Sequence, residues 1–485
     1  MIVALFIMLG ACAPQPRTEG PPSLVLVSLD TFRADRVGAL GGPAGLTPNL
    51  DAFAAESTVF EAAYSQAVQT TPSHTSVFTS RYPSETTGAD GDPYVPPETP
   101  LLAQLLKLYG FQTGAFVGGG DLSEARGLSG GFDRYTQGPD FGSLWHTTPP
   151  ALAWLDERDA AKPYFLFVHG YDAHSPYLKP PPYGYLRADA AAAGPGQEAV
   201  RSATERIVDG VMYQGFWVLM HGYEERLRPR SAEGRAWTAR EGAADGEPTQ
   251  VVSEADIALV RGVYDGGVAY ADAQFGRLMA GLQARGALDE AWIVVMADHG
   301  EQLGERGIFG HCCDTGDEET HVPLLVRAPG GAGGGQRVRG IVELVDVMPT
   351  LLAIVGATPP AGIHGVSLLD AARGAPFAGR AYAYTEGSET MRTLSMRGAA
   401  GRLTWTGLPA TAPQLPALLR AVRADGPSFT ADAALPVVTR AQMRDAMVEW
   451  VRALAPPPTG AVSRPPRPAA LDAALRAHGY WDAAP

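Results

Sequence analysis

Four short apolar segments of this chain each have a carboxylate or an imidazole within five residues of one end. The side chains concerned are Asp30, His174, Asp298, His299 and His321. Imidazole among carboxylates favours Zn²⁺ or Mn²⁺, whereas Ca²⁺ prefers ligands that are all oxygen. If the apolar segments are strands of one sheet, these side chains converge at one edge. The sequence therefore predicts one divalent metal ion, with Zn or Mn favoured and Ca possible.

The segment TTPSHTSVFTSRYP (70–83) holds a candidate nucleophile. Thr71 is predicted as the N-cap of a helix and Pro72 as its first residue, so Thr70 lies just outside the helix N-terminus. The partial positive charge there suits an anion. Thr70 is either a second capping hydroxyl or a nucleophile whose pKa a metal ion lowers. The predicted metal site comprises Asp30, Thr70, Asp298 and His299.

Three histidines are further catalytic candidates. His174 and His321 could contact the non-bridging oxygens of a substrate or act as general acid. His74 could orient Thr70 or only satisfy a backbone carbonyl, and the sequence does not separate these roles. A second metal ion, held by Asp172 with His174 and His321, is a further alternative.

The apolar segments have the length and composition of strands that are buried on both faces. They are SLVLVSL (23–29), YFLFVH (164–169), WIVVMA (292–297) and VPLLVRA (322–328). Helical patterns between them include residues 98–110 and 271–286, each ending in glycine. Strands that alternate with helices predict an α/β fold with a doubly wound, mostly parallel sheet. Ligands of such sheets bind beyond the carboxyl ends of the strands.

The N-terminal segment predicts export. MIVALFIMLGACAP contains an apolar run too short to span a bilayer and is typical of a signal peptide (1–11). Leu9-Gly10-Ala11-Cys12 resembles a lipobox, so we expect lipid on Cys12 and a tether over 12–22, although a plain cleaved signal is the alternative. The predicted location is the bacterial cell envelope, as a periplasmic or surface lipoprotein. A net charge of -14 argues against nucleic acid and anionic membrane surfaces as partners.

The rest of the chain divides into two predicted units. Residues 23–375 form the catalytic domain, in which 181–250 read as a largely helical insertion, and 376–485 form a smaller C-terminal subdomain. Cys312 and Cys313 are adjacent, so they form a vicinal disulfide or stay as two thiols, and a structural role is favoured over a catalytic one.

A series of motifs resembles the sulfatase family of the alkaline phosphatase superfamily. In the family's order they include LVLVSLDTFRADRVGALGG, TTPSHTSVFTSRYP, FLFVHGYDAHSPY, VVMADHGEQLGERGIFGH and VELVDVMPTLLAIVG. The resemblance covers about residues 25–370. It implies the alkaline phosphatase-like fold and an enzyme that hydrolyses sulfate or phosphate esters with the help of a metal ion.

The chain departs from the family's signature Cys-x-Pro-Ser-Arg, whose cysteine or serine is oxidised to formylglycine. Thr70 stands at the cysteine position and His74 at the arginine position, and threonine offers no route to formylglycine. The substrate histidine of the family matches His174, and His321 replaces a usual lysine. The family's Asp-Asp pair is Asp30-Thr31 here.

The predicted metal set with threonine resembles that of phosphoethanolamine and lipoteichoic-acid transferases and of nucleotide phosphodiesterases. The leading hypothesis is therefore a sulfatase-family hydrolase of sulfate or phosphate esters that uses Thr70. Its substrate would be a sulfated or phosphorylated small molecule or glycan. One alternative is transfer of a phospho group to envelope glycans or lipids. The other is an inactive member that binds glycans.

Overall fold

The structure is a computed structural model. It describes residues 20–86, 95, 99–175, 177, 179–180, 182–183, 227–229, 237–239, 251–252, 254–305, 309–311, 314–387, 393–406, 428–432 and 435–454. The predicted signal peptide, Cys12, Cys312 and Cys313 lie outside these residues. Among the helices within them, none has both the length and the apolar character that crossing a bilayer requires.

The core of the protein is an eight-stranded sheet with the order β15-β2-β14-β10-β1-β6-β4-β5. Its strands are β1 (Ser23–Leu29), β2 (Thr58–Phe60), β4 (Gln112–Val117), β5 (Arg134–Gln137), β6 (Tyr164–Gly170), β10 (Ala291–Met296), β14 (Leu324–Arg327) and β15 (Gln336–Val338). β14 runs antiparallel to both of its neighbours, and the other pairs are parallel. The predicted α/β fold with a mostly parallel sheet is confirmed.

The predicted strands match the observed ones closely, with one exception. The segment 322–328 is divided at Pro323 into β13 (His321–Val322) and β14. Because proline has no N–H to donate, it interrupts a ladder of hydrogen bonds. β13 belongs to a separate sheet with β3 (Ala63–Tyr64) and β16 (Val342–Glu343).

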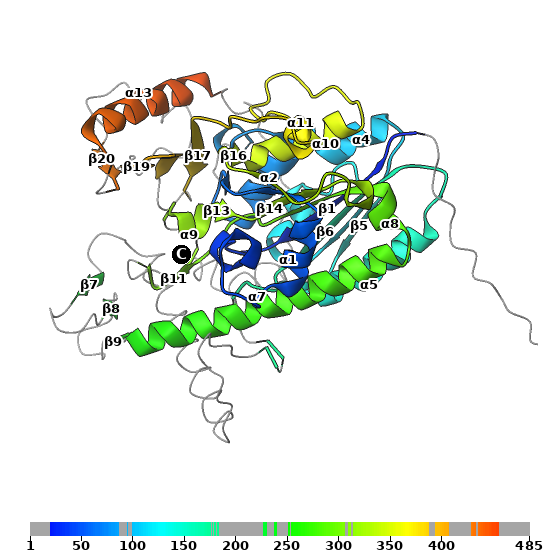
Figure 1. The fold of residues 1–485 in the computed structure, drawn as a ribbon, viewed down its shortest axis with the longest axis horizontal. Helices are drawn as coiled ribbons and strands as arrows, with labels where there is room; N and C mark the ends of the chain where they lie inside the picture. Colours follow the sequence, from blue (N-terminus) through cyan, green and yellow to red (C-terminus); the bar gives the residue numbers. More distant parts are fainter. Residues whose placement is uncertain are drawn as a thin grey trace, which may run out of the picture.

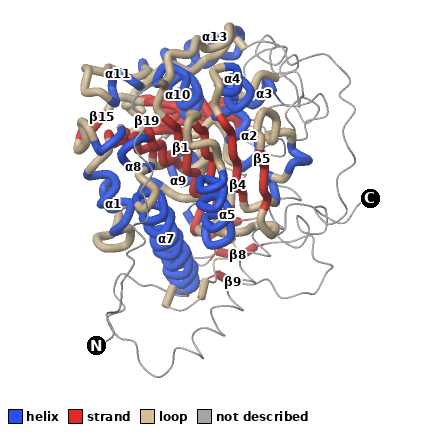
Figure 2. Tube along the Cα trace, turned by 90° about the vertical axis from the view of Figure 1, so that its right-hand side faces the viewer, coloured by secondary structure: helices blue, strands red, loops and turns tan. Residues whose placement is uncertain are grey.

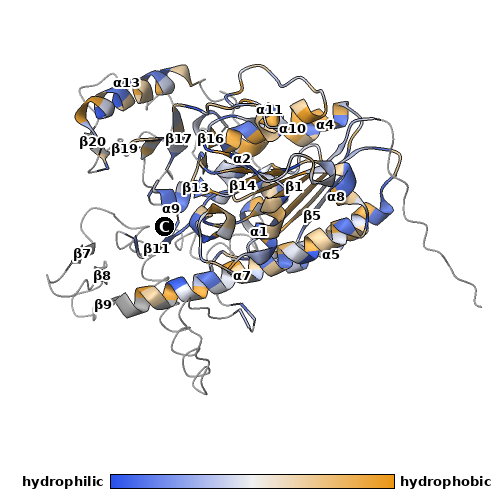
Figure 3. Ribbon diagram, viewed as in Figure 1, coloured by the Kyte–Doolittle hydropathy of each residue, from blue (hydrophilic) through white to orange (hydrophobic). Residues whose placement is uncertain are grey.

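Helices cover both faces of the central sheet (Figures 1 and 2). One layer consists of α1 (Pro48–Ala55), α5 (Leu144–Glu157) and α7 (Glu254–Gln283), and the other of α2 (Thr70–Thr79), α4 (Leu102–Leu108) and α10 (Val347–Ile354). The short helices are α3 (Pro83–Thr86), α8 (Ala287–Glu290), α9 (Asp317–Thr320) and α11 (Leu369–Ala372). The pattern at 271–286 is only the last part of α7, which begins seventeen residues earlier. Apolar residues occur both in the strands of the central sheet and in the helices that cover it, and together they form the core (Figure 3).

The predicted helical insertion is only partly described. Its described residues include β7 (Leu227–Pro229) and β8 (Trp237–Ala239), which form an antiparallel sheet with β9 (Val251–Val252). Most of the segment 181–250 lies outside the described residues, so its predicted helical content stays a prediction.

The C-terminal part has its own sheet and apolar cluster. Its elements are β17 (Tyr382–Glu386), β18 (Leu394–Gly398), β19 (Gly401–Thr406), β20 (Ser428–Ala431) and α13 (Val437–Ala453). The four strands are antiparallel, and α13 contributes Met443, Met447 and Val451 to a cluster with Met396 and Trp405. The predicted subdomain boundary at residue 376 lies shortly before β17.

A buried carboxyl group links the two parts. Glu343 is fully buried and accepts hydrogen bonds from the Tyr82 hydroxyl at 3.0 Å and from the Tyr384 N–H at 2.8 Å. Arg380 lies 3.1 Å from the same carboxyl. Burial raises the pKa of Glu343 to about 7 in spite of the guanidinium. Tyr82 also packs edge-on against Trp450 of α13.

This carboxyl predicts a pH-dependent stability. The pKa of Glu343 is about 7 when folded and about 4.3 when unfolded, so the folded chain binds its proton more tightly. The stabilising contribution is complete below about pH 4 and is lost as pH rises to about 7. Across this range the stability advantage of wild type over Glu343→Gln should fall by about 3 kcal/mol. Denaturant unfolding at several pH values measures it.

The exposed Glu157→Gln is the matched control, since Glu157 bonds only Arg134 at the surface. Its stability curve should run parallel to that of wild type. Parallel curves for Glu343→Gln as well would contradict the assignment of this pH dependence to Glu343.

Candidate metal centre and active site

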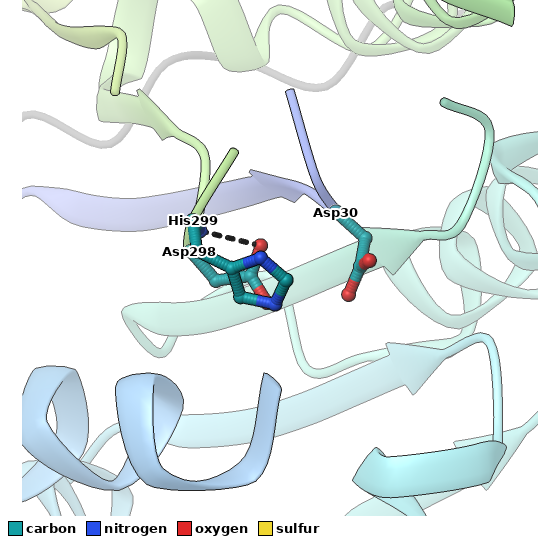
Figure 4. Close-up of side chains that lie close together, drawn as sticks. All are labelled: Asp30, Asp298 and His299. Atoms are coloured by element: carbon teal, nitrogen blue, oxygen red, sulfur yellow. Dashed lines mark hydrogen bonds and ion pairs between the residues drawn. The ribbon is translucent and has the colours of Figure 1, made fainter. Parts of the chain in front are cut away.

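Two neighbouring strands bring the predicted ligands together. Asp30 directly follows β1, and Asp298 and His299 come just after β10. Because β1 and β10 are parallel and in register from Ser23 and Ala291 onward, their carboxyl ends lie at the same edge of the sheet. Figure 4 shows the three side chains turned toward one another. All three are fully buried, and one ligand atom from each lies within 4.8 Å of the others.

The donor atoms of this group fit a cation. Asp30 Oδ1, Asp298 Oδ2 and His299 Nε2 are buried and have no hydrogen-bond partner among the described residues. The other polar atoms of these side chains already have hydrogen-bond partners. His299 Nδ1 donates to the Gly300 carbonyl at 2.9 Å, and Asp298 Oδ1 accepts the N–H groups of Thr31 and His299. Buried polar atoms without partners are costly. A divalent ion would satisfy all three at once.

The electrostatics of the group lead to the same conclusion. Burial, together with the nearby Asp298 charge, raises the pKa of Asp30 well above its usual value. Burial also raises the pKa of Asp298 and lowers that of His299 to about 4. The imidazole is therefore neutral and its Nε2 lone pair is available to a metal ion. Two adjacent buried carboxylates require a cation to stay ionised together.

Thr70 lies at this group, as the first residue of α2. Its hydroxyl donates to Asp30 Oδ2 at 3.2 Å, and its side chain is buried. The predicted capping arrangement is wrong by two residues, because the helix begins at Thr70 with Gln69 as N-cap, and Pro72 is its third residue. Proline is tolerated throughout the first turn, where the N–H groups have no partner within the helix. Thr70 thus lies in the first turn, where the partial positive charge of the helix is concentrated.

His74 lies one turn after Thr70 on α2 and contacts Thr70 and Asp298. Its Nδ1 donates to the Thr70 carbonyl at 2.8 Å, and its Nε2 is 2.9 Å from the Ser28 hydroxyl. Nδ1 is also 3.6 Å from Asp298 Oδ2. Burial lowers the pKa of His74, so the ring is neutral. These contacts suit a residue that positions Thr70 and Asp298 and give it no direct access to a substrate.

His169 is a site residue that the sequence reasoning missed. It lies in β6 directly beside Ser28 of β1, and its Nε2 is 3.2 Å from Asp30 Oδ2. Burial lowers its pKa well below the usual value, so the neutral ring donates one hydrogen bond to the carboxylate. A single histidine within the apolar run YFLFVHG was the available signal.

We expect His169→Ala to weaken metal binding about 10- to 100-fold, because groups that hydrogen-bond a ligating carboxylate fix its orientation. Competition with a metal-binding dye measures the dissociation constant. His146→Ala is the matched control, since His146 is exposed and bonds only Ser143 in the first turn of α5. Equal metal affinities for wild type and His169→Ala would contradict this role.

His174 and His311 form a pair beside the metal group. Their Nε2 atoms are 3.2 Å apart, and the His311 ring lies 4.4 Å from the His299 ring, centroid to centroid. His311 Nδ1 donates to the carbonyl of Val68, two residues before Thr70. His174 was predicted and His311 was not. His311 lies in a loop after β12 (Phe309–Gly310), and no local pattern distinguishes it.

His321 is directed elsewhere. It pairs with Tyr64 in the small β3–β13 sheet, its Nε2 contacts the Glu61 carbonyl at 2.8 Å, and its ring stacks on Tyr64. Pro323 separates β13 from β14, so His321 is held in the small sheet with β3 and not in the central sheet. Within the described residues His321 makes no contact with Asp30, Thr70, Asp298 or His299.

The second predicted metal set does not assemble. Asp172 Oδ2 accepts the N–H of Leu144 at the start of α5, at 2.7 Å, and burial raises the pKa of Asp172 to about 6. Among the described residues, Asp30, Asp298 and His299 form the one group of three or more potential ligands that converge.

Thr31, which stands in place of the family's second aspartate, has a strained backbone. Its φ is 53°, a region that β-branched residues rarely adopt. Its hydroxyl is turned back to the Asp30 carbonyl, and its N–H donates to Asp298 Oδ1. The Tyr264 hydroxyl holds the Thr31 carbonyl at 2.6 Å. Thr31 therefore contributes its backbone, and not its side chain, to the site.

The guanidinium groups near the site are engaged by carboxylates. Arg33 is buried and pairs with Asp35 at 2.7 Å and Glu305 at 2.9 Å. Arg126 pairs with Asp121. Within the described residues, the surroundings of Thr70 thus consist mainly of neutral imidazoles and carboxyl groups.

Comparisons with known proteins agree with this architecture. The sulfatase family model matches residues 22–357. The multifunctional alkaline phosphatase superfamily protein PehA of Trinickia caryophylli is 29% identical over 237 residues, which cover 47% of this chain and 41% of PehA. The N-acetylglucosamine-6-O-sulfatase of Bacteroides thetaiotaomicron is 25% identical over 412 residues, 74% of this chain and 72% of that protein.

A solved structure shares the fold. The phosphonate monoester hydrolase of Agrobacterium radiobacter superimposes with a TM-score of 0.64 at 20% identity, covering 89% of this chain and 95% of that one. The family match spans well over half of the 485 residues. The chain therefore belongs to the sulfatase family, and its fold is that of the alkaline phosphatase superfamily.

Proposed function

We propose that the protein is a metal-dependent hydrolase that cleaves singly charged phosphorus esters, such as phosphonate monoesters or phosphodiesters, with Thr70 as its nucleophile. The observation that carries this proposal is the 3.2 Å hydrogen bond from the Thr70 hydroxyl to Asp30, within a group whose unpartnered buried atoms fit a divalent ion. Family membership supports ester hydrolysis as the reaction class. When bound, the ion would act as a Lewis acid that lowers the pKa of a hydroxyl.

The residues present can carry the chemistry. Thr70 Oγ attacks phosphorus, and its proton passes to Asp30 Oδ2, the atom it already contacts. The bond from phosphorus to the ester oxygen breaks, and that oxygen leaves with the electron pair and takes up a proton from water. Water then cleaves the phosphorus–Oγ bond and restores the Thr70 hydroxyl. His174 and His311 lie where they can contact the non-bridging oxygens, since His311 bonds the chain just before Thr70.

Charge favours a monoanion as substrate. Two carboxylates and one divalent ion sum to zero, and burial lowers the pKa values of His74, His169, His299 and His311, so these rings add no positive charge. Arg33 and Arg126 are already paired with carboxylates, and the buried Lys179, whose amino group donates to the His174 carbonyl, interacts with the charges of Asp172 and Glu301. A phosphate monoester dianion would leave two negative charges without compensation in a buried site, whereas a monoanion would leave only one.

The nucleophile favours phosphorus over sulfur. A threonine phospho-ester can be released by water, whereas a threonine sulfate has no geminal hydroxyl to expel the sulfate. With an aryl sulfate we therefore expect at most a burst of one phenol per protein molecule, followed by arrest. The hydrolase from Agrobacterium radiobacter, which shares the fold, acts on phosphonate monoesters, and this supports a phosphorus ester as the substrate.

The test is turnover of four 4-nitrophenyl esters with added Zn²⁺, Mn²⁺ or Ca²⁺: a phosphonate monoester, a phosphodiester, a phosphate monoester and a sulfate. We expect kcat/KM for the best monoanionic phosphorus ester to exceed that for the phosphate monoester at least about tenfold, a difference of about 1.4 kcal/mol. Steady turnover of the sulfate, or a preference for the dianion, would overturn the proposed substrate class. A phosphorylated alcohol formed with added glycerol would favour the transferase alternative.

A further inference from the structure

We propose that Phe141 forms a subsite for the leaving group of the substrate, and that this subsite accepts a flat ring, either an aromatic ring or the face of a sugar. The inference rests on the proposed function, because it takes His174 and His311 as neighbours of the reacting phosphorus. It concerns the other half of the substrate, for which the metal group and Thr70 provide no recognition.

The first observation is the place of the ring. Phe141 lies 5.3 Å from the His174 ring and 5.0 Å from the Tyr171 ring, centroid to centroid. His174 contacts His311 through Nε2, and Tyr171 packs edge-on against His169, which bonds Asp30. Two side chains therefore separate Phe141 from the metal group along each of two routes, and His174 is the first of them on one route.

The second observation is the backbone of Phe141. Its φ is 59°, in the left-handed region that favours glycine. The loop holds this conformation firmly: the Gly142 N–H donates to the Gly118 carbonyl at 2.8 Å, and the Tyr171 N–H donates to the Gly142 carbonyl at 3.1 Å. A Cβ on Gly118 would lie 2.2 Å from the Gly142 carbonyl, so the two loops pack as closely as they can.

A strained bulky residue between tightly packed loops suggests a use for its side chain. Glycine would relieve the strain at position 141, yet the chain carries a phenyl ring there, and that ring is only half-buried. A half-buried aromatic ring beside His174 provides apolar contact with a planar partner. A leaving group that rests against His174 would meet this face.

The experiment compares Phe141→Ala and Phe141→Tyr with wild type on three phosphonate monoesters: the 4-nitrophenyl, the glucose 6- and the 2,2,2-trifluoroethyl ester. We expect Phe141→Ala to lower kcat/KM about tenfold, mainly through KM, on one or both ring-bearing esters and less than twofold on the trifluoroethyl ester. Phe141→Tyr should stay within twofold of wild type. The ester that is affected identifies an aromatic or a sugar leaving group.

Trp145→Ala is the matched control, because Trp145 is an exposed aromatic residue on α5, where it lies against Arg277. It should leave all three esters unchanged. An equal loss on all three esters in Phe141→Ala, or a loss only in kcat, would overturn the subsite and leave a structural role for Phe141.

A separate binding measurement distinguishes failure of the subsite from failure of the proposed reaction. If wild type cleaves none of the esters, the proposed reaction is wrong. The subsite can then still be tested by measuring how tightly Thr70→Ala binds the intact 4-nitrophenyl and trifluoroethyl esters. At least fivefold weaker binding of the aryl ester after Phe141→Ala in that background supports the subsite. Unchanged binding overturns it.

Discussion

Thr70→Ala should lower kcat by about 10⁴-fold or more on any ester that wild type turns over, since removing a covalent nucleophile costs rates of this order. The protein should still fold, because the Thr70 hydroxyl makes one hydrogen bond, to Asp30. Thr70→Ser keeps the oxygen and should retain measurable turnover. Steady-state kinetics and quenched-flow trapping of the labelled phospho-protein measure both expectations.

Thr75→Ala is the matched control, because Thr75 is a buried threonine on the same helix whose hydroxyl bonds only the Thr71 carbonyl. It should stay within about tenfold of wild type, corresponding to about 1.4 kcal/mol. Turnover by Thr70→Ala at a rate close to that of this control would show that another group attacks the ester.

Removal of the metal should abolish turnover and destabilise the fold. The unpartnered atoms of Asp30, Asp298 and His299 give the folded chain a cation site that an unfolded chain lacks. Zn²⁺ or Mn²⁺ at a hundredfold excess over its dissociation constant should add about 2.7 kcal/mol to the free energy of unfolding. Chelation followed by metal titration, with activity and thermal melting recorded together, measures both effects.

The metal affinity should also depend on pH. The pKa values of Asp30 and Asp298 are raised when no ion is bound, so protons compete with the metal ion and its affinity should fall as pH falls. Asp298→Asn should bind no stoichiometric metal. Asp272→Asn, which alters a buried carboxyl bonded to Asn49 and Leu50, should bind one ion per chain. Full activity in a chelated, metal-free sample would refute a role for the ion.

Several features of the protein follow from its sequence alone. Uninterrupted apolar runs form stable strands only where both faces are covered, so β1, β6 and β10 could be located to within one residue at each end. Asp30, Asp298 and His299 come within three residues of a strand end, and a parallel sheet brings such positions to one edge. Pro72, a residue typical of the first turn of a helix, placed Thr70 near the start of one, although the observed start lies two residues earlier than predicted. The positions of Asp30, Asp298 and His299 therefore follow from the direction of each strand and from the pairing of parallel strands.

Other features were decided only by the tertiary structure. His169 reaches Asp30 because the β1–β6 register sets it beside Ser28, and strand register is a long-range property. His311, and not His321, lies beside His174. His321 is held in the small sheet by β13, whereas His311 reaches the site from the loop after β12. The strained backbones of Thr31 and Phe141 exist because distant hydrogen bonds hold them. Contacts between segments far apart in the chain leave no periodic trace in the sequence, so only the folded structure reveals them.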